Sequence, residues 1–256
     1  MVGTQPHRDL EHEHRPERVR RRLHAAGGSG HVGDAVLGAV DGGITSFAVV
    51  AGAVGGGFSS VVVVVLGFAS LLADGFSMAV SNYLGTKSES EGAAQAHREE
   101  RRHIEEVPEG QCDELREIFA AKGFEGETLE RIVEALSSDD QLWAETVARE
   151  EFGVQPADTG KPLRAGGATF AAFLAAGLVP LAPFLVPALT PQQAFATSIA
   201  ATTVAFLAIG LLKARALQQP LLRSGLETLL TGGGAALLAY GVGALLRGWL
   251  GTGAVA

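Results

Sequence analysis

The feature that most constrains this chain is an uncharged run of about 48 residues between Arg164 and Lys213. A helix needs only about 20 predominantly apolar residues to cross the hydrocarbon core of a membrane. A soluble core has no use for so long a run without charge, because helices at a water-facing surface carry polar residues on one side. We therefore expect this part of the chain to lie in a membrane.

Apolar stretches elsewhere complete a predicted set of five membrane spans. The first two are joined by a glycine turn, and the last three follow a polar segment. The five predicted spans are residues 32–55, 58–84, 165–189, 192–212 and 225–246. Three prolines between residues 180 and 187 are expected to kink the third span or end it early. The predicted fold is an all-α polytopic membrane protein.

The segment from residue 85 to residue 164 differs sharply from the spans. It holds about 20 of the 28 acidic residues of the chain against about 10 basic ones. Apolar residues recur within it at the i, i+3, i+4 spacing of amphipathic helices, which predicts a domain of about three helices between spans two and three. The acidity favours a cationic ligand and argues against nucleic acid, whose phosphates require clustered Lys and Arg.

The predicted organisation has four parts. They are a basic, histidine-containing tail (1–31), the first two spans (32–84), the acidic helical domain with its linker (85–164) and the last three spans (165–256). Lys and Arg are found in the tail, at the ends of the acidic domain and between the last two spans, whereas the other two connections are uncharged. Cytosolic flanks carry the positive excess, so the N-terminus and the helical domain are expected in the cytosol and the C-terminus outside.

Two predicted spans contain carboxylates. Asp41 lies in the first and Asp74 in the second, and each costs about 2.5 to 3.5 kcal/mol near the centre of a span, which makes both functional candidates. Met78 follows Asp74 by one helical turn and so shares its face. Carboxylate oxygen with thioether sulfur suits a transition metal better than Mg(II) or Ca(II). Asp41, Asp74 and Met78 are therefore the predicted transport pathway.

The acidic domain offers a second group of candidate ligands. Glu100 and His103 share one helical face, Glu114 and Glu117 share another, and Glu151 lies at the end of the last predicted helix. Such residues form a metal site only if they converge in space, which sequence spacing cannot show. The single cysteine excludes a zinc ribbon and an intrachain disulfide, so the ligands must offer oxygen or nitrogen.

No enzyme is indicated by the sequence. The Glu100-x-x-His103 pattern matches one half of a di-iron carboxylate site, but the second copy that such a site needs is absent from this domain. The glycine-rich turn at residues 55–57 is not followed by the Lys-Ser/Thr of a phosphate-binding loop. We expect no bound cofactor apart from metal ions.

Three stretches of sequence carry a resemblance to a known family. They are Asp-Gly-Gly-Ile-Thr-Ser-Phe-Ala-Val-Val-Ala-Gly at 41–52, Leu-Ala-Asp-Gly-Phe-Ser-Met at 72–78, and Tyr-Leu at 83–84 with Lys-Ser-Glu at 87–89. Together they resemble the vacuolar iron transporter family, which includes yeast calcium-sensitivity-complementing and plant nodulin-like members. The resemblance covers nearly the whole chain from about Asp34 onward.

The resemblance implies a five-span homodimer whose first spans line a path at the dimer interface, with a cytosolic metal-binding domain between spans two and three. It also implies proton-coupled export of Fe(II), often Mn(II), from the cytosol. Asp41 and Met78 match the pore carboxylate and methionine of the family. The positions of its ligating glutamates are taken here by Glu100, Glu114, Glu117 and Glu151.

The chain departs from the family pattern at several positions. Ser70 replaces a pore glutamate of plant members, although Asp74 lies one turn later on the same face. His103 replaces a ligating glutamate, and Val147 and Ala148 replace methionines. These differences leave open whether the ion is iron or manganese.

Two functions are compatible with these patterns. The first is a transporter that exports Fe(II) or Mn(II) from the cytosol by proton antiport, with the bilayer, protons and a second copy of the chain as partners. The alternative is a membrane-anchored metal sensor or storage protein, although a mere anchor gains nothing from intramembrane carboxylates. The short chain, which has no sorting signal, favours a bacterial inner membrane as the host.

Overall fold

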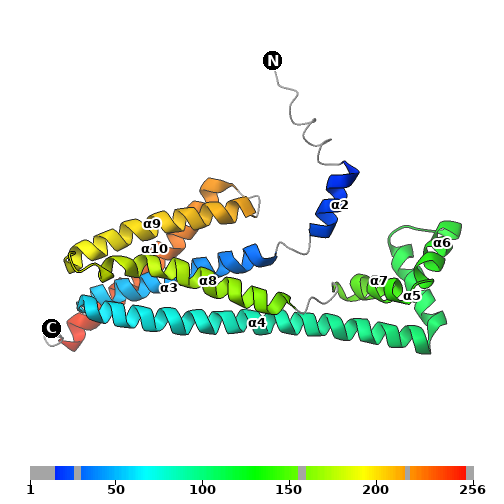
Figure 1. Cartoon of the computed structure of the whole chain (residues 1–256), viewed down its shortest axis with the longest axis horizontal. Coiled ribbons are helices and arrows are strands. Elements are labelled where there is room, and N and C mark those ends of the chain that lie inside the picture. The colour runs from blue at the N-terminus through cyan, green and yellow to red at the C-terminus, as the bar shows by residue number, and fades with distance from the viewer. Residues whose placement is uncertain (1–14, 26–29, 155–159, 217–219, 252–256) are drawn as a thin grey trace, which may run out of the picture. The chain divides into compact units, whose positions relative to one another are not determined.

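The computed structural model describes residues 15–25, 30–154, 160–216 and 220–251, and every regular element among them is a helix (Figure 1). In chain order the helices are α2 (Pro16–Ala25), α3 (Gly30–Gly55), α4 (Ser60–Glu106), α5 (Pro108–Ala121), α6 (Gly126–Ser137), α7 (Asp140–Phe152), α8 (Lys161–Leu181), the 3₁₀ helix η1 (Ala182–Leu185), α9 (Pro191–Ala216) and α10 (Leu221–Leu250).

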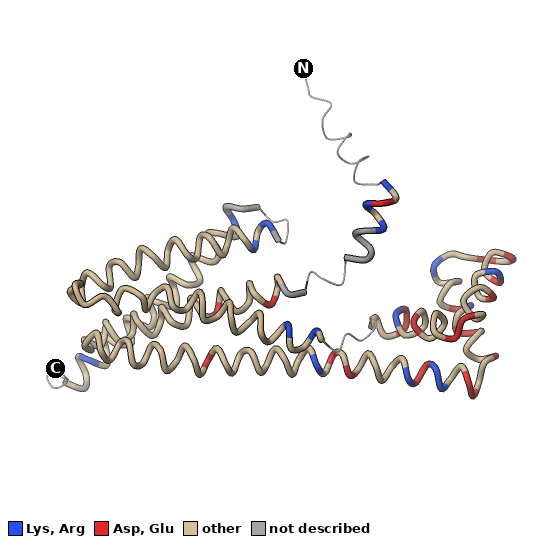
Figure 2. The backbone as a smooth tube through the Cα atoms, in the orientation of Figure 1, with Lys and Arg blue, Asp and Glu red and all other residues tan. Residues whose placement is uncertain are grey.

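Five stretches are long and apolar enough to cross a membrane. They are Val32–Gly55, Ser60–Glu106, Lys161–Leu185, Pro191–Arg215 and Arg223–Trp249. Charged residues are sparse along α8, α9 and α10 and crowded over the later part of α4 and over α5 to α7 (Figure 2). The predicted all-α fold is confirmed for the described residues, and five of its helices are candidate membrane spans.

Helix α4 extends beyond the predicted second span. That span was expected to end at Leu84, and the helix continues without a break from Ser60 to Glu106. Its 47 residues are more than twice the ~20 that a span needs, so the helix has an apolar part and a polar part. The polar part remains helical because residues 87–106 are rich in the helix formers Ala, Glu and Arg, and the next proline is Pro108.

The end of α8 agrees with the expectation from its prolines. Pro180 lies inside the helix, which ends at Leu181 and continues only as the short 3₁₀ turn of η1. The carbonyl of Pro180 accepts a hydrogen bond from the Ser198 hydroxyl of α9 at 2.8 Å. A neighbouring helix thus supplies a partner for one of the last carbonyls of α8, which have none within the helix.

The chain forms two compact units, one made of Met1–Asn82 with Arg164–Ala256 and the other of Tyr83–Leu163. In the first unit α10 packs along α3 and α9, and α3 also contacts α9. Its buried side chains include Phe47 and Phe206, whose rings meet edge to face at 6.4 Å between centroids. Phe173 of α8 is fully buried in the same unit.

Two glycines set how closely the helices of the first unit approach. A side-chain carbon at Gly42 of α3 would overlap the backbone carbonyl of Phe173 on α8. A side-chain carbon at Gly243 of α10 would likewise overlap the carbonyl of Gly52 on α3. Small residues allow such close helix packing in membranes, where no hydrophobic effect drives helices together. Gly42 therefore fixes α3 against α8 directly beside Asp41.

The second unit consists of the polar part of α4 with α5, α6 and α7. Its core brings together one or two large apolar residues from each helix: Ile104, Leu115, Val133, Trp143 and Val147. The start of α7 is capped by Asp139, whose carboxylate accepts hydrogen bonds from the backbone N–H groups of Gln141 and Leu142. This small apolar centre positions the acidic side chains that surround it.

Candidate functional site

The two intramembrane carboxylates lie near one another. Asp41 of α3 and Asp74 of α4 are close enough for their charges to interact, and the Thr45 side chain forms a hydrogen bond with Asp41. On α4 the Ser70 hydroxyl donates to a carboxylate oxygen of Asp74 at 2.5 Å. The i, i+4 spacing places each hydroxyl one turn from the carboxylate that it contacts. Each carboxylate thus has a local hydroxyl partner and no cationic partner among the described residues.

Both carboxylates are exposed on the surface of the single chain. Asp41 and Asp74 are accessible, whereas Met78 is half-buried and packs against the core cluster that contains Phe173. Lipid is a poor environment for a carboxylate, since it can neither solvate nor pair with the charge. Their exposure therefore requires water, a cation or another protein surface beside this part of α3 and α4.

An amide at the end of this region joins three helices. The Asn82 side chain of α4 donates to Asp34 of α3 at 2.9 Å and to the Thr169 hydroxyl of α8 at 2.7 Å. Thr169 is fully buried and also contacts the Asp34 backbone carbonyl. Sequence reasoning did not identify Asn82. A lone amide near the end of a span gives no periodic signal.

The acidic unit brings three of the predicted ligands together. Carboxylate oxygens of Glu100, Glu114 and Glu151 all lie within 4.8 Å of one another. They come from α4, α5 and α7, so residues far apart in sequence converge. Glu100 is only 1% exposed, Glu114 is half-buried and Glu151 is exposed, so the group extends from the interior to the surface. Three carboxylates so close together repel one another unless protons or a cation neutralise them.

Proton affinity in this group reflects that repulsion. Burial, a hydrogen bond with Glu151 and the charges of Glu151 and Glu100 raise the pKa of Glu114 to about 7. Burial and the charge of Glu151 also raise the pKa of Glu100, against the opposing effects of His103 and Gln111. A carboxyl group such as Glu114, with a pKa of about 7, can exchange its proton for a divalent cation near neutral pH, because ligation requires the deprotonated form.

Two predicted ligands lie outside this group. His103 Nδ1 is 3.9 Å from a carboxylate oxygen of Glu100, too far for a hydrogen bond. Glu117 is exposed on α5 and does not join the three carboxylates, although it lies one turn from Glu114. Of the five residues expected in this site, the structure places three together.

Gln111 is a member of the group that sequence reasoning missed. Its side chain is buried, with 6% exposed, and its Nε2 donates to Glu114 Oε2 at 2.6 Å. It precedes Glu114 by three residues, so helical spacing could have placed both on one face of α5. The predicted ligands were acidic residues, histidine and methionine, so a neutral amide was not among them.

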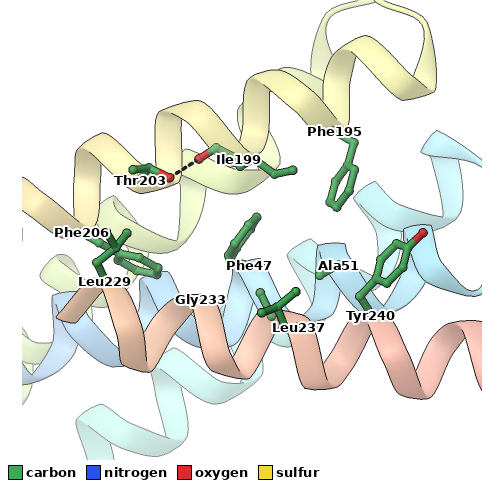
Figure 3. A pocket seen from close by; sticks show the side chains of 11 residues that line it. Phe47, Ala51, Phe195, Ile199, Thr203, Phe206, Leu229, Gly233, Leu237 and Tyr240 are labelled. Atoms are coloured by element: carbon green, nitrogen blue, oxygen red, sulfur yellow. Dashed lines mark hydrogen bonds between the residues drawn. The ribbon is translucent and has the colours of Figure 1, made fainter. Parts of the chain in front are cut away.

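A separate pocket in the first unit has a different character. About 360 Å³ in volume, it lies between α3, α9 and α10 and is lined by apolar side chains that include Phe47, Phe195 and Tyr240 (Figure 3). Its one threonine, Thr203, donates its hydroxyl to the carbonyl of Ile199 on the same helix. None of the residues that line this pocket is a carboxylate, so the pocket lacks the charged ligands of the two sites described above.

Comparison with known proteins identifies relatives that match over most of the chain. The profile of the VIT family matches residues 32–244. Vacuolar iron transporter 1 of Oryza sativa subsp. japonica is 31% identical over 90% of this chain and 89% of its own length. Vacuolar iron transporter 1 of Arabidopsis thaliana is 30% identical over 82% of this chain and 83% of its own length. The vacuolar iron transporter of Toxoplasma gondii is 29% identical over 88% of this chain and 77% of its own length. Because the family profile covers most of the chain, this protein belongs to the VIT family.

Proposed function

We propose that this protein carries a divalent transition metal ion, Fe(II) or Mn(II), out of the cytosol in exchange for protons. The observation that carries the proposal is the pair Asp41 and Asp74, two neighbouring carboxylates within helices long enough to span a membrane. Intramembrane carboxylates are costly, and they mark ion or proton pathways when they face a polar path. The names of the relatives, which are vacuolar iron transporters, support a metal as the cargo.

In the proposed pathway Asp41 and Asp74 bind the ion together. Their negative charges compensate the ion's two positive charges in a medium of low dielectric constant. Met78 lies one turn beyond Asp74 and supplies a sulfur ligand that favours Fe(II) or Mn(II) over Mg(II). Protons that reach the two carboxylates from the far side neutralise them and release the ion, which couples export to proton entry.

In the same proposal, the carboxylates of Glu100, Glu114 and Glu151 bind the metal ion from the cytosol before it enters the membrane path. Three oxygens within 4.8 Å of one another can enclose one divalent ion, and the raised pKa of Glu114 makes that capture sensitive to pH. His103 and Glu117, which lie nearby, are proposed as outer groups that attract the ion by charge or bind it transiently on the way in.

The proposed arrangement in the membrane follows from charge and exposure. The basic tail and the acidic unit lie in the cytosol, and the C-terminus lies outside. The proposed assembly is a homodimer, which the exposure of Asp41 and Asp74 on the single chain supports, because a second copy would cover them. A bacterial inner membrane is kept as the proposed host, although the relatives are named for vacuoles.

The test is uptake of Fe(II) and Mn(II) into proteoliposomes under an imposed pH gradient, with internal pH recorded. Asp41→Ala should abolish uptake and the coupled proton movement. Glu227→Ala is the matched control. It removes a carboxylate of α10 that already pairs with Arg223 at 3.0 Å, so uptake should be retained. Equal uptake by the unmodified chain and Asp41→Ala would refute the proposed pathway.

The alternative function remains a membrane-anchored metal sensor or storage protein. The observation that favours it is the carboxylate group of the acidic unit, which can bind an ion without any transport. It predicts Mn(II) binding that Glu114→Gln weakens, together with no uptake by the unmodified chain. The same proteoliposome preparation therefore separates the two functions.

A further inference from the structure

One basic residue lies at the end of the last membrane helix. Arg247 is in the final turn of α10, and no Asp, Glu, Lys or Arg occurs between it and Glu227. A helix rises about 1.5 Å per residue, so these two charged residues are about 30 Å apart along α10, which is the thickness of the hydrocarbon core of a bilayer. Arg247 is therefore expected at the level of the lipid headgroups on one side of the membrane.

The guanidinium group of Arg247 lies over the turn between α3 and α4. Its Cζ and Nη1 are 2.9 Å, and its Nε is 3.0 Å, from the point that a side-chain carbon at Gly57 would occupy. Within this turn the N–H groups of Gly57 and Phe58 donate to the last carbonyls of α3. Arg247 itself forms no hydrogen bond or ion pair within the described part of the chain. Its five N–H donors are thus available to a ligand.

A groove in the apolar surface begins beside this guanidinium group. It has a volume of about 430 Å³ and lies between α3 and α10, and Arg247 is its one charged residue among those described. Its other walls are three glycines, Ala239 and the apolar side chains of Phe58, Val242 and Leu246. From Ala239 to Arg247 the groove follows α10 for about 12 Å, close to the depth of the hydrocarbon layer of one leaflet, which is half of about 30 Å.

We propose that Arg247 and this groove bind one anionic phospholipid, of which phosphatidylglycerol is the simplest example. The planar guanidinium group matches two oxygens of a phosphate, so it binds the phosphodiester of the lipid in a bidentate manner. One acyl chain of the same lipid lies in the groove along Val242 and Ala239. A headgroup that has no ammonium group is preferred, because a second cation beside the phosphate would repel Arg247.

A lipid explains the position of Arg247 better than two simpler alternatives. An arginine that only reaches for water carries its charged group away from the apolar surface, whereas this guanidinium group lies across Gly57 at the mouth of the groove. A second copy of the chain in the same membrane would need an acceptor at this end of its own spans. The connections at this end, residues 56–59 and 186–190, contain no acidic residue. A lipid phosphate supplies the missing negative charge.

The measurement is native mass spectrometry of the full chain in detergent, titrated with phosphatidylglycerol. Arg247→Gln should weaken binding of the lipid about fivefold, the effect expected for one Arg beside an anionic lipid. Arg247→Lys should give an intermediate affinity, because it retains the charge and loses the bidentate geometry. Arg223→Gln is the matched control, since Arg223 is also on α10 and already pairs with Glu227 at 3.0 Å. It should change the affinity less than about twofold, as is usual for an exposed ion pair.

A second variant tests the groove independently of the charge. Val242 is 55% exposed, so Val242→Phe can place its ring in the groove without entering the core. It should weaken phosphatidylglycerol binding about fourfold, roughly the effect of leaving one methylene group of the acyl chain exposed. Phosphatidylcholine should bind more weakly than phosphatidylglycerol to the unmodified chain. Inorganic phosphate in large excess should not displace the lipid, because it lacks the acyl chain.

Four outcomes would overturn the lipid site. They are equal lipid binding by the unmodified chain and Arg247→Gln, equal weakening by Arg223→Gln, displacement of the lipid by inorganic phosphate, and loss of a dimer in Val242→Phe when no lipid is bound. The last would identify the groove as a protein interface. If Arg247→Gln does not fold, Arg247→Lys and Val242→Phe still decide the question. None of these measurements involves metal uptake, so the lipid site and the proposed transport are tested separately.

Discussion

The capture site should bind its ion with a pH dependence set by Glu114. A proton and the ion compete for the same carboxylate, so the apparent dissociation constant increases as the carboxylate becomes protonated. With a pKa of about 7, Glu114 is mostly ionised at pH 8 and mostly protonated at pH 6. Competition by one such group weakens binding about tenfold between these pH values, whereas an unperturbed glutamate near pKa 4.3 would change it by only about 2%.

Further groups change the size of this effect but not its direction. Burial and the charge of Glu151 raise the pKa of Glu100 as well, so any competition from its proton acts in the same direction. His103 also lies nearby, with Nδ1 at 3.9 Å from a carboxylate oxygen of Glu100. The variant His103→Gln removes its imidazole and should retain most of the tenfold change.

The assay is Mn(II) titration of the full chain in detergent at pH 8, 7 and 6, with Glu151→Gln as the reference that lacks the capture site. Glu114→Gln should bind more weakly at pH 8 and show a much flatter pH profile, because it cannot lose a proton. A change of less than twofold between pH 8 and pH 6 in the unmodified chain would refute this account of the Glu114 environment.

Two further predictions concern stability. Gly42→Ala should lower the free energy of unfolding of the detergent-solubilised chain by about 1–3 kcal/mol, since the new methyl group overlaps the Phe173 carbonyl. The loss should appear as a lower melting temperature. Gly33→Ala in the same helix meets no neighbour within 4 Å and should be neutral or slightly stabilising, so equal losses in the two variants would contradict the packing argument. Asp139→Ala should cost about 1 kcal/mol by removing the cap of α7, as measured by urea unfolding, and Asp140→Ala is its control.

The membrane part of the fold was largely predictable from sequence. Uncharged runs of about 20 or more residues leave few alternatives to membrane helices, so all five spans were identified. The continuation of α4 beyond Leu84 was not predicted, because a change from apolar to polar composition does not by itself show whether a helix ends. Nothing after Leu84 breaks the helix until Pro108 begins the next one.

The candidate sites were only partly predictable. Glu100 and Glu114 were recognised as acidic residues on helical faces, but their convergence with Glu151 depends on how three helices pack around Leu115 and Val147. Helical spacing alone predicted Glu117 and Glu114 equally as ligands, although only Glu114 lies with Glu100 and Glu151. The chemical types of the ligands were thus readable from sequence, whereas their tertiary arrangement was not.

The hydrogen bonds of Asn82 have a consequence for local unfolding. Asn82 fastens α4 to Asp34 and Thr169 at the residue where the first compact unit ends. Proteins open locally in cooperative pieces that follow their packing and not their secondary structure. Amide hydrogens of α4 before Asn82 should thus exchange with solvent only when the membrane bundle opens, and those after it whenever the acidic unit opens. One continuous helix then belongs to two cooperative pieces, and the acidic unit can loosen without opening the membrane bundle.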